Sequence, residues 1–104
     1  MEFIVRKMSS KPGAAYVRYD CPCGCKPGVE YTRDRSEAEH EHCCCGNVHF
    51  VGPNARTQLE EYLRGREAED ADLGGYAVSE TNVPAPWGGD IAVAYALPSK
   101  PRSH

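Results

Sequence analysis

All six cysteines of this 104-residue chain fall in two short groups. The first group is Cys21, Cys23 and Cys25, and the second is the consecutive run Cys43–Cys45. Each group contains the pattern Cys-x-Cys-Gly, at residues 21–24 and 43–46. A glycine after a sulfur ligand lets the backbone turn tightly, so that neighbouring N–H groups can point at the sulfur. Because four thiolates from two such turns can complete a tetrahedral zinc site, the sequence predicts Zn²⁺ bound between the two groups.

The predicted ligands are the cysteines that share a one-residue gap: Cys21, Cys23, Cys43 and Cys45. Other sulfur and imidazole groups nearby remain possible ligands: Cys25, Cys44, His49 and His42. Zinc accepts imidazole as well as thiolate, and in an extended chain His49 shares a face with Cys43 and Cys45. A surface strand position explains His49 equally well, and the charged neighbours of His42 favour a solvated side chain.

The sequence pattern predicts neither export nor membrane insertion. Its start, residues 1–5, does not have the pattern of a secretory signal, and no apolar run approaches the roughly 20 residues of a membrane span. We therefore expect a cytoplasmic protein that does not associate with membranes. In a reducing compartment clustered cysteines more often hold metal than form disulfides, so metal binding is the favoured interpretation.

The charge limits the choice of partner. The formal net charge is −3, and a site of four thiolates around one Zn²⁺ adds about −2. A nucleic-acid partner is possible but has no electrostatic support, because such surfaces are usually basic. The expected partner is an unidentified protein. A homodimer through the alanine-rich face of residues 92–96 is a further possibility.

Patterns along the chain predict strands on both sides of each cysteine group. Alternating or apolar stretches predict strands at residues 3–7, 15–20, 29–33, 47–51, 76–78 and 91–97. The first cysteine group then lies at a hairpin tip rich in proline and glycine, and the second at the entrance to the strand 47–51. Residues 33–42 are almost all polar and predict an exposed connection, and residues 84–90 predict a turn.

One helix is predicted after Pro53. Asn54 is its expected N-cap and Gly65 its expected end, with an acidic, solvated extension over residues 66–72. The fold class is therefore α+β: a small antiparallel β domain, of zinc-ribbon or β-tent type, with one helix. We expect a single domain over residues 1–98 and a flexible tail over residues 99–104. In the last strand Ala92, Ala94 and Ala96 share a face, which indicates that another element packs closely there.

The segment 43–50, Cys-Cys-Cys-Gly-Asn-Val-His-Phe, resembles the Cys-x-Cys-Gly-x-Val-x-Phe segment of the glutathione-dependent formaldehyde-activating family. The resemblance covers eight residues. It implies an Mss4-like β fold built around zinc, and in some members a second zinc that acts on thiol adducts. In that family a Cys-x-Cys-x-x-Cys turn follows this segment, whereas here the group at residues 21–25 precedes it. The resemblance thus supports zinc on a β scaffold more than it supports the enzyme activity.

Three functions are compatible with these residues. The first is a protein-interaction or regulatory module with a structural zinc site. The second is metal handling, meaning sequestration or sensing of zinc, copper or mercury, because the thiols outnumber the ligands of one ion. The third is a zinc enzyme acting on thiol adducts, with Cys23, Cys25 and His49 as ligands and Glu39 or Glu41 as a base. Redox cycling of the adjacent cysteines 43–45 is a lesser alternative.

Overall fold

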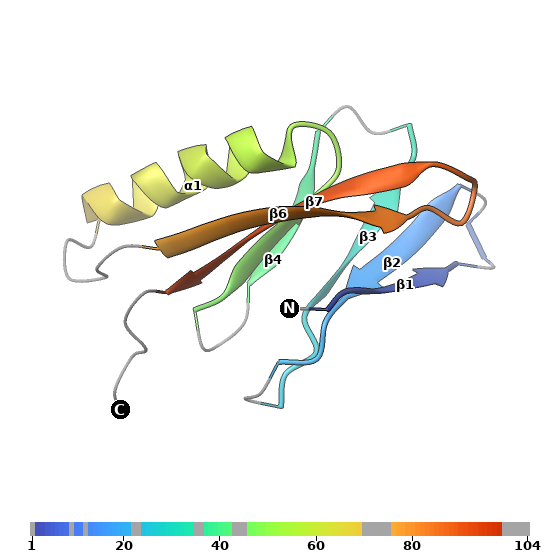
Figure 1. Cartoon of the computed structure of the whole chain (residues 1–104), viewed down its shortest axis with the longest axis horizontal. Coiled ribbons are helices and arrows are strands. Elements are labelled where there is room, and N and C mark those ends of the chain that lie inside the picture. Colours follow the sequence, from blue (N-terminus) through green and yellow to red (C-terminus); the bar gives the residue numbers. More distant parts are fainter. Residues whose placement is uncertain are drawn as a thin grey trace.

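Seven strands and one helix make up the described part of the chain (Figure 1). The computed structural model describes residues 2–8, 10–11, 13–21, 24–34, 37–42, 46–69 and 76–98. In chain order the elements are β1 (Ile4–Lys7), β2 (Ala14–Arg18), β3 (Gly28–Thr32), β4 (Glu39–His42), β5 (Val48–Val51), α1 (Ala55–Glu69), β6 (Tyr76–Pro84) and β7 (Asp90–Pro98). This arrangement confirms the predicted α+β class.

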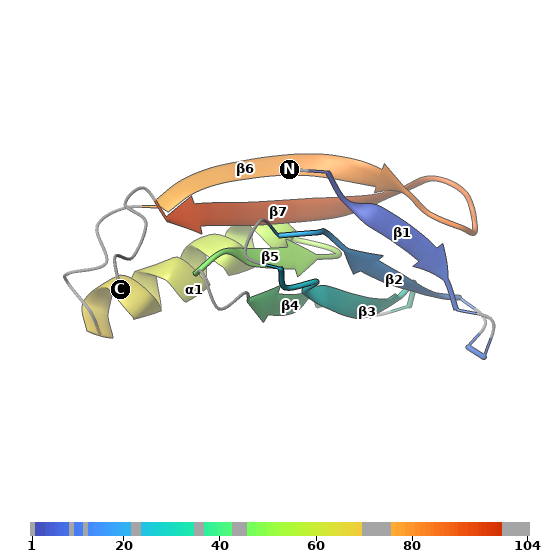
Figure 2. The ribbon, with the colours of Figure 1, turned by 90° about the horizontal axis from the view of Figure 1, so that it is seen from below.

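The strands form two antiparallel sheets, which lie against each other in Figure 2. The first sheet has the order β1-β2-β3, and the second has the order β4-β5-β7-β6. In the first sheet β2 and β3 form a hairpin in which Arg18 pairs with Gly28. In the second sheet β4 and β5 form a hairpin in which His42 pairs with Val48. Each cysteine group therefore falls in the connection of one hairpin, and the two hairpins belong to different sheets.

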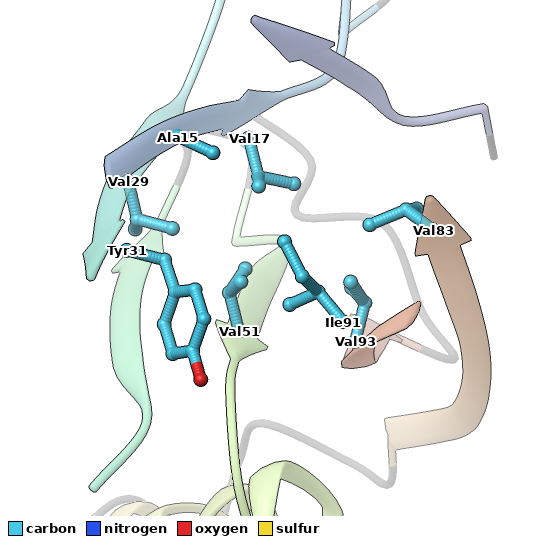
Figure 3. Close-up of a cluster of buried hydrophobic side chains, with 8 residues drawn as sticks. All are labelled: Ala15, Val17, Val29, Tyr31, Val51, Val83, Ile91 and Val93. Carbon is cyan, nitrogen blue, oxygen red and sulfur yellow. The ribbon is translucent and has the colours of Figure 1, made fainter. Parts of the chain in front are cut away.

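One face of the second sheet packs on the first sheet and buries a cluster of branched side chains (Figure 3). The members from the first sheet are Ala15, Val17, Val29 and Tyr31, and those from the second are Val51, Val83, Ile91 and Val93. The strict alternation along β7 puts Ile91 and Val93 on this face, as the sequence predicts. Full burial of each valine or isoleucine contributes about 1.5–3 kcal/mol, so this cluster is the main force that holds the sheets together.

Helix α1 covers part of the opposite face of the second sheet (Figure 1). Leu59 and Leu63 of the helix are buried together with Phe50 of β5 and with Ala94 and Ala96 of β7. The small alanine side chains let the helix approach the sheet, which confirms that another element packs closely on this face. Because α1 of the same chain buries Ala94 and Ala96, no second copy is needed there, and the homodimer stays a prediction.

Three predicted boundaries are wrong, and the first is the end of β6, which continues past residue 78 to Pro84. Residues 33–42 do not form only an exposed connection, because Glu39–His42 form the edge strand β4. An edge strand needs main-chain pairing more than apolar side chains, and β4 obtains it from β5 in a regular register. The helix also continues past Gly65 to Glu69. Gly65 is exposed and lowers helix stability by roughly 1 kcal/mol relative to alanine, which is not enough to end a packed helix.

The predicted helix start is confirmed, since α1 begins at Ala55 directly after Asn54. Asn54 has a positive φ of 59°, and its main-chain carbonyl accepts a 3.0 Å bond from the N–H of Gln58. Within the described ranges no helix combines the length and apolar composition that a membrane crossing requires. The predicted tail, residues 99–104, lies outside the described residues, as do residues 70–72 of the predicted extension.

Candidate metal-binding site

The first cysteine group lies in a closed turn at the end of the β2–β3 hairpin. The N–H of Tyr19 donates to the carbonyl of Pro27 at 3.3 Å, so the hairpin continues past the last strand residue. The N–H of Cys21 donates to the carbonyl of Cys25 at 3.0 Å, and that of Gly24 donates to the carbonyl of Cys21 at 2.9 Å. These bonds fix Cys21 and Cys25 on the two arms of one tight turn.

Cys21 and Cys25 differ in their surroundings. Cys21 is buried, with 7% of its surface exposed, and it packs in a small cluster with Tyr19. Cys25 is half-buried at the border of the same cluster. Cys23, the third member of the group, lies outside the described residues. Of the two described sulfurs, that of Cys21 is therefore the one that faces the interior.

The second cysteine group belongs to the connection between β4 and β5. Since His42 pairs with Val48, residues 43–47 join the two strands. Cys43, Cys44 and Cys45 lie outside the described residues, but Gly46 and Asn47 are described. Gly46 has a φ of 96°, and Gly24 in the first turn has a φ of 94°. The glycines of both Cys-x-Cys-Gly patterns thus adopt the same left-handed conformation, which other residues rarely adopt.

One contact joins the two hairpin ends. The side-chain Nδ2 of Asn47 lies 3.8 Å from the Sγ of Cys21, 26 positions earlier in the chain. Asn47 immediately follows the second Cys-x-Cys-Gly pattern, so the contact brings this end of the second pattern next to the first cysteine of the first pattern. This proximity is what a site that uses both groups requires.

His49, two residues after Asn47, is fully buried, so its interpretation as a surface residue is wrong. Its ring packs edge to face on Tyr19, with centroids 5.2 Å apart, and lies 5.6 Å from the ring of Phe3. By strict geometry neither ring nitrogen has a hydrogen-bond partner among the described residues, although the backbone of Val17 acts on the ring as a weak hydrogen-bonding group. Burial of a polar group without a good hydrogen-bond partner costs free energy.

Burial lowers the pKa of His49 from 6.5 to about 4, because the charged imidazolium loses its hydration. The backbone of Val17 and the carboxylate of Glu41 raise this pKa in part, and His40 lowers it further. Glu41 is the cross-strand partner of His49 in the β4–β5 register. At neutral pH the imidazole is therefore uncharged, which is the form that binds metals.

The remaining histidines of this region lie on the other side of β4. His40 stacks on Phe50, with centroids 4.7 Å apart and planes at 12°. His42 is exposed at the end of the strand. The candidate bases Glu39 and Glu41 alternate with these histidines along β4 and are half-buried. His42 and His49 therefore lie on opposite faces of the second sheet, so one ion cannot easily take both.

The described residues alone do not complete a metal site. No group of three or more histidine, cysteine, aspartate or glutamate side chains suited to an ion occurs within the described ranges. Of the four predicted ligands, Cys21 is described, whereas Cys23, Cys43 and Cys45 are not. Of the three ligands expected if the protein were a zinc enzyme, Cys25 and His49 are described and Cys23 is not. The choice among the ligand sets therefore stays a prediction.

Sequence reasoning missed Asn47, Tyr19 and Phe3, which surround Cys21 and His49. Asn47 is marked in the sequence only as the residue after the second pattern. Tyr19 is a strand residue by its alternation, and nothing local to it indicates contact with His49, thirty positions along the chain.

Comparisons of the chain with protein-family models, with curated proteins and with solved structures found no match. The class that the fold defines is thus a small β-rich α+β domain with two antiparallel sheets. The Mss4-like resemblance of residues 43–50 stays a prediction.

Proposed function

We propose that the protein is a zinc-binding domain whose Cys-x-Cys-Gly turns hold one Zn²⁺ between them. The proposed ligands are Cys21, Cys23, Cys43 and Cys45. The contact of Asn47 with the sulfur of Cys21 carries this proposal, because it joins two cysteine-bearing hairpins that are distant in sequence. The role of the ion is structural, and the domain serves as a protein-interaction or regulatory module.

The positive φ of Gly24 and Gly46 is compatible with the proposal, and Gly13, Gly52, Gly88 and Gly89 in other turns share it. A glycine with positive φ after Cys-x-Cys turns the chain so that main-chain N–H groups can face a sulfur ligand. Two thiolates from each turn would satisfy the four-coordinate preference of zinc.

Energetic considerations favour a structural role for the proposed zinc. The domain is small, and its buried clusters are made mainly of alanine and valine. A structural zinc contributes about 10–16 kcal/mol in small peptides, which is comparable to the whole stability of a domain this size. Zinc at the hairpin ends would therefore link the two sheets in addition to the apolar cluster between them.

The proposal extends to fold type and compartment. The two turns come from hairpins of different sheets, which fits a β-tent arrangement better than a zinc ribbon. Four reduced thiolates require a reducing compartment, so we place the protein in the cytoplasm. Cys25, Cys44, His49 and His42 are the alternative ligands, and the buried neutral imidazole of His49 favours it among these.

Native mass spectrometry of the protein, purified under reducing conditions in the presence of zinc, tests the proposal. The expected result is one Zn²⁺ per chain, retained through buffer exchange, and unfolding of the chain when a strong chelator removes the ion. Absence of bound metal would contradict the proposal. Two or more ions per chain, exchanged without unfolding, would favour metal handling instead.

The same preparation separates a structural from a catalytic zinc. When Co²⁺ replaces zinc, a site closed by four protein ligands gives a tetrahedral thiolate spectrum that added cyanide leaves unchanged. A catalytic site keeps an open position, so a spectral change on addition of cyanide would favour the enzyme that acts on thiol adducts.

A further inference from the structure

Asn47 has a side chain placed to act on the proposed ligand Cys21. It lies between Gly46 and the first residue of β5, and it is half-buried. Asn47 contacts Cys21, and His49, two residues later, contacts Tyr19, so both side chains meet the Tyr19–Cys21 segment. Its Nδ2 approaches the Cys21 sulfur at 3.8 Å, within the range of an N–H···S hydrogen bond.

The chemistry of a metal-bound thiolate explains what such an amide does. The sulfur keeps negative charge and lone pairs after it binds the ion, and buried charge is costly unless donors stabilise it. An asparagine amide supplies a neutral donor, so it stabilises the sulfur without adding a positive charge. Donors of this kind orient ligands, and their loss typically weakens metal binding by about 10–100-fold.

We propose that Asn47 is a positioning residue of the zinc site, which donates its side-chain N–H to the Cys21 thiolate and so holds this ligand toward the ion. The inference rests on the proposed function, because it assumes that Cys21 binds zinc. It adds a residue that the cysteine pattern does not include and assigns it a hydrogen bond rather than a metal bond.

The test compares Asn47→Ala and Asn47→Leu with the wild-type protein. Leucine keeps the number and branching of the side-chain heavy atoms of asparagine and removes the donor, and alanine removes both, so the pair separates the hydrogen bond from packing. Gln58→Ala is the matched control: the amide of Gln58 also makes a long side-chain bond, to the carbonyl of Pro53 at 3.4 Å, but on helix α1. Each protein is loaded with Zn²⁺ for affinity measurement by chelator competition and with Co²⁺ for absorption spectroscopy.

Both Asn47 variants are expected to bind zinc about 10–100-fold more weakly than the wild type, with Gln58→Ala within twofold of it. Their sulfur-to-cobalt charge-transfer band is expected to move to lower energy, because a thiolate without its donor gives up electrons more easily. A purely structural role for Asn47 would leave this band in place.

The outcomes separate the two proposals. Failure of the wild type to bind zinc overturns both the zinc-binding function and the role of Asn47. Zinc binding by the wild type, with affinity within twofold and an unchanged charge-transfer band in both Asn47 variants, overturns the role of Asn47 alone. The role of Asn47 is also overturned if Gln58→Ala shifts the charge-transfer band as much as the Asn47 variants do, because the effect would then not be local to the Cys21 sulfur.

Discussion

The rings of Tyr19 and His49 meet edge to face between the two sheets, with centroids 5.2 Å apart and planes at 79°. Cys21 lies two residues after Tyr19, and Asn47 lies two residues before His49. The sulfur of Cys21 is 3.8 Å from the side-chain amide nitrogen of Asn47. The two hairpins therefore contact each other through the aromatic pair and, two residues away, through the amide–sulfur pair. Such edge-to-face packing contributes about 0.5–1.5 kcal/mol beyond the buried area, and it fixes the approach of the two cysteine-bearing turns.

Serine substitutions at Cys21 and Cys25 will distinguish the possible ligand pairs of the first turn. Cys21 is buried beside Asn47, whereas Cys25 is half-buried at the border of its cluster. We expect Cys21→Ser to abolish stable zinc binding and Cys25→Ser to retain one ion per chain, as measured by native mass spectrometry. The opposite pattern would show that Cys23 and Cys25 supply the first pair.

Replacement of Gly24 by alanine is expected to destabilise the zinc-loaded protein by about 1–2 kcal/mol. The cause is conformational, because φ is 94° and a Cβ at this position would meet no other atom within 4 Å. Urea denaturation measures the effect.

Gly65→Ala is the control for this substitution. A Cβ at Gly65 also meets nothing within 4 Å, but this residue lies inside α1. Alanine should therefore stabilise the protein there, by roughly 0.5–1 kcal/mol. If both variants change stability in the same direction, backbone conformation does not explain the requirement for Gly24.

The burial of His49 predicts a pH-dependent loss of stability. Its pKa is about 4 in the folded protein and 6.5 is its ordinary value. Between these values the unfolded chain binds a proton that the folded chain does not, so stability falls as the pH falls from 6.5 to 4. Above pH 6.5 the imidazole is neutral in both states and the group has no effect on the pH dependence. The full loss amounts to about 3 kcal/mol.

His49→Leu isolates this contribution, since thiolate protonation and zinc release on acidification affect both proteins. We expect the variant to bind one zinc and to lose less stability than the wild type between pH 6.5 and pH 4. At pH 7 it should be as stable or more stable, because it removes a buried polar group. If the wild type and His49→Leu give parallel curves of unfolding free energy against pH, His49 is not buried as described. If His49→Leu does not bind zinc, His49 is a zinc ligand.

Leu59 anchors α1 to the second sheet. It is fully buried together with Phe50, Ala94 and Ala96. Leu59→Ala should lower the free energy of unfolding by about 2–5 kcal/mol, because the alanines facing it are too small to fill the cavity. The exposed Glu61→Ala on the same helix should change it by less than about 0.5 kcal/mol. Equal effects of both variants on urea denaturation would contradict the packing of α1 on this face.

The sequence by itself determined the elements that depend on neighbouring residues. Alternation predicted β2, β3, β5 and β7, proline and glycine predicted the turns between them, and Asn54 predicted the start of α1. These features follow from local chemistry, since side-chain period and backbone conformation are set within a few residues. The α+β class and the location of the first cysteine group in a hairpin turn were available for the same reason.

Only the tertiary structure decided which distant segments meet. Glu39–His42 became a strand because β5 offers a partner edge, although the side chains of this segment indicate solvent. His49 became buried because the first sheet brings Tyr19 and Phe3 over it, and the same approach put Asn47 beside Cys21. Such contacts depend on how two sheets stack, and no pattern within either segment encodes the other segment's position.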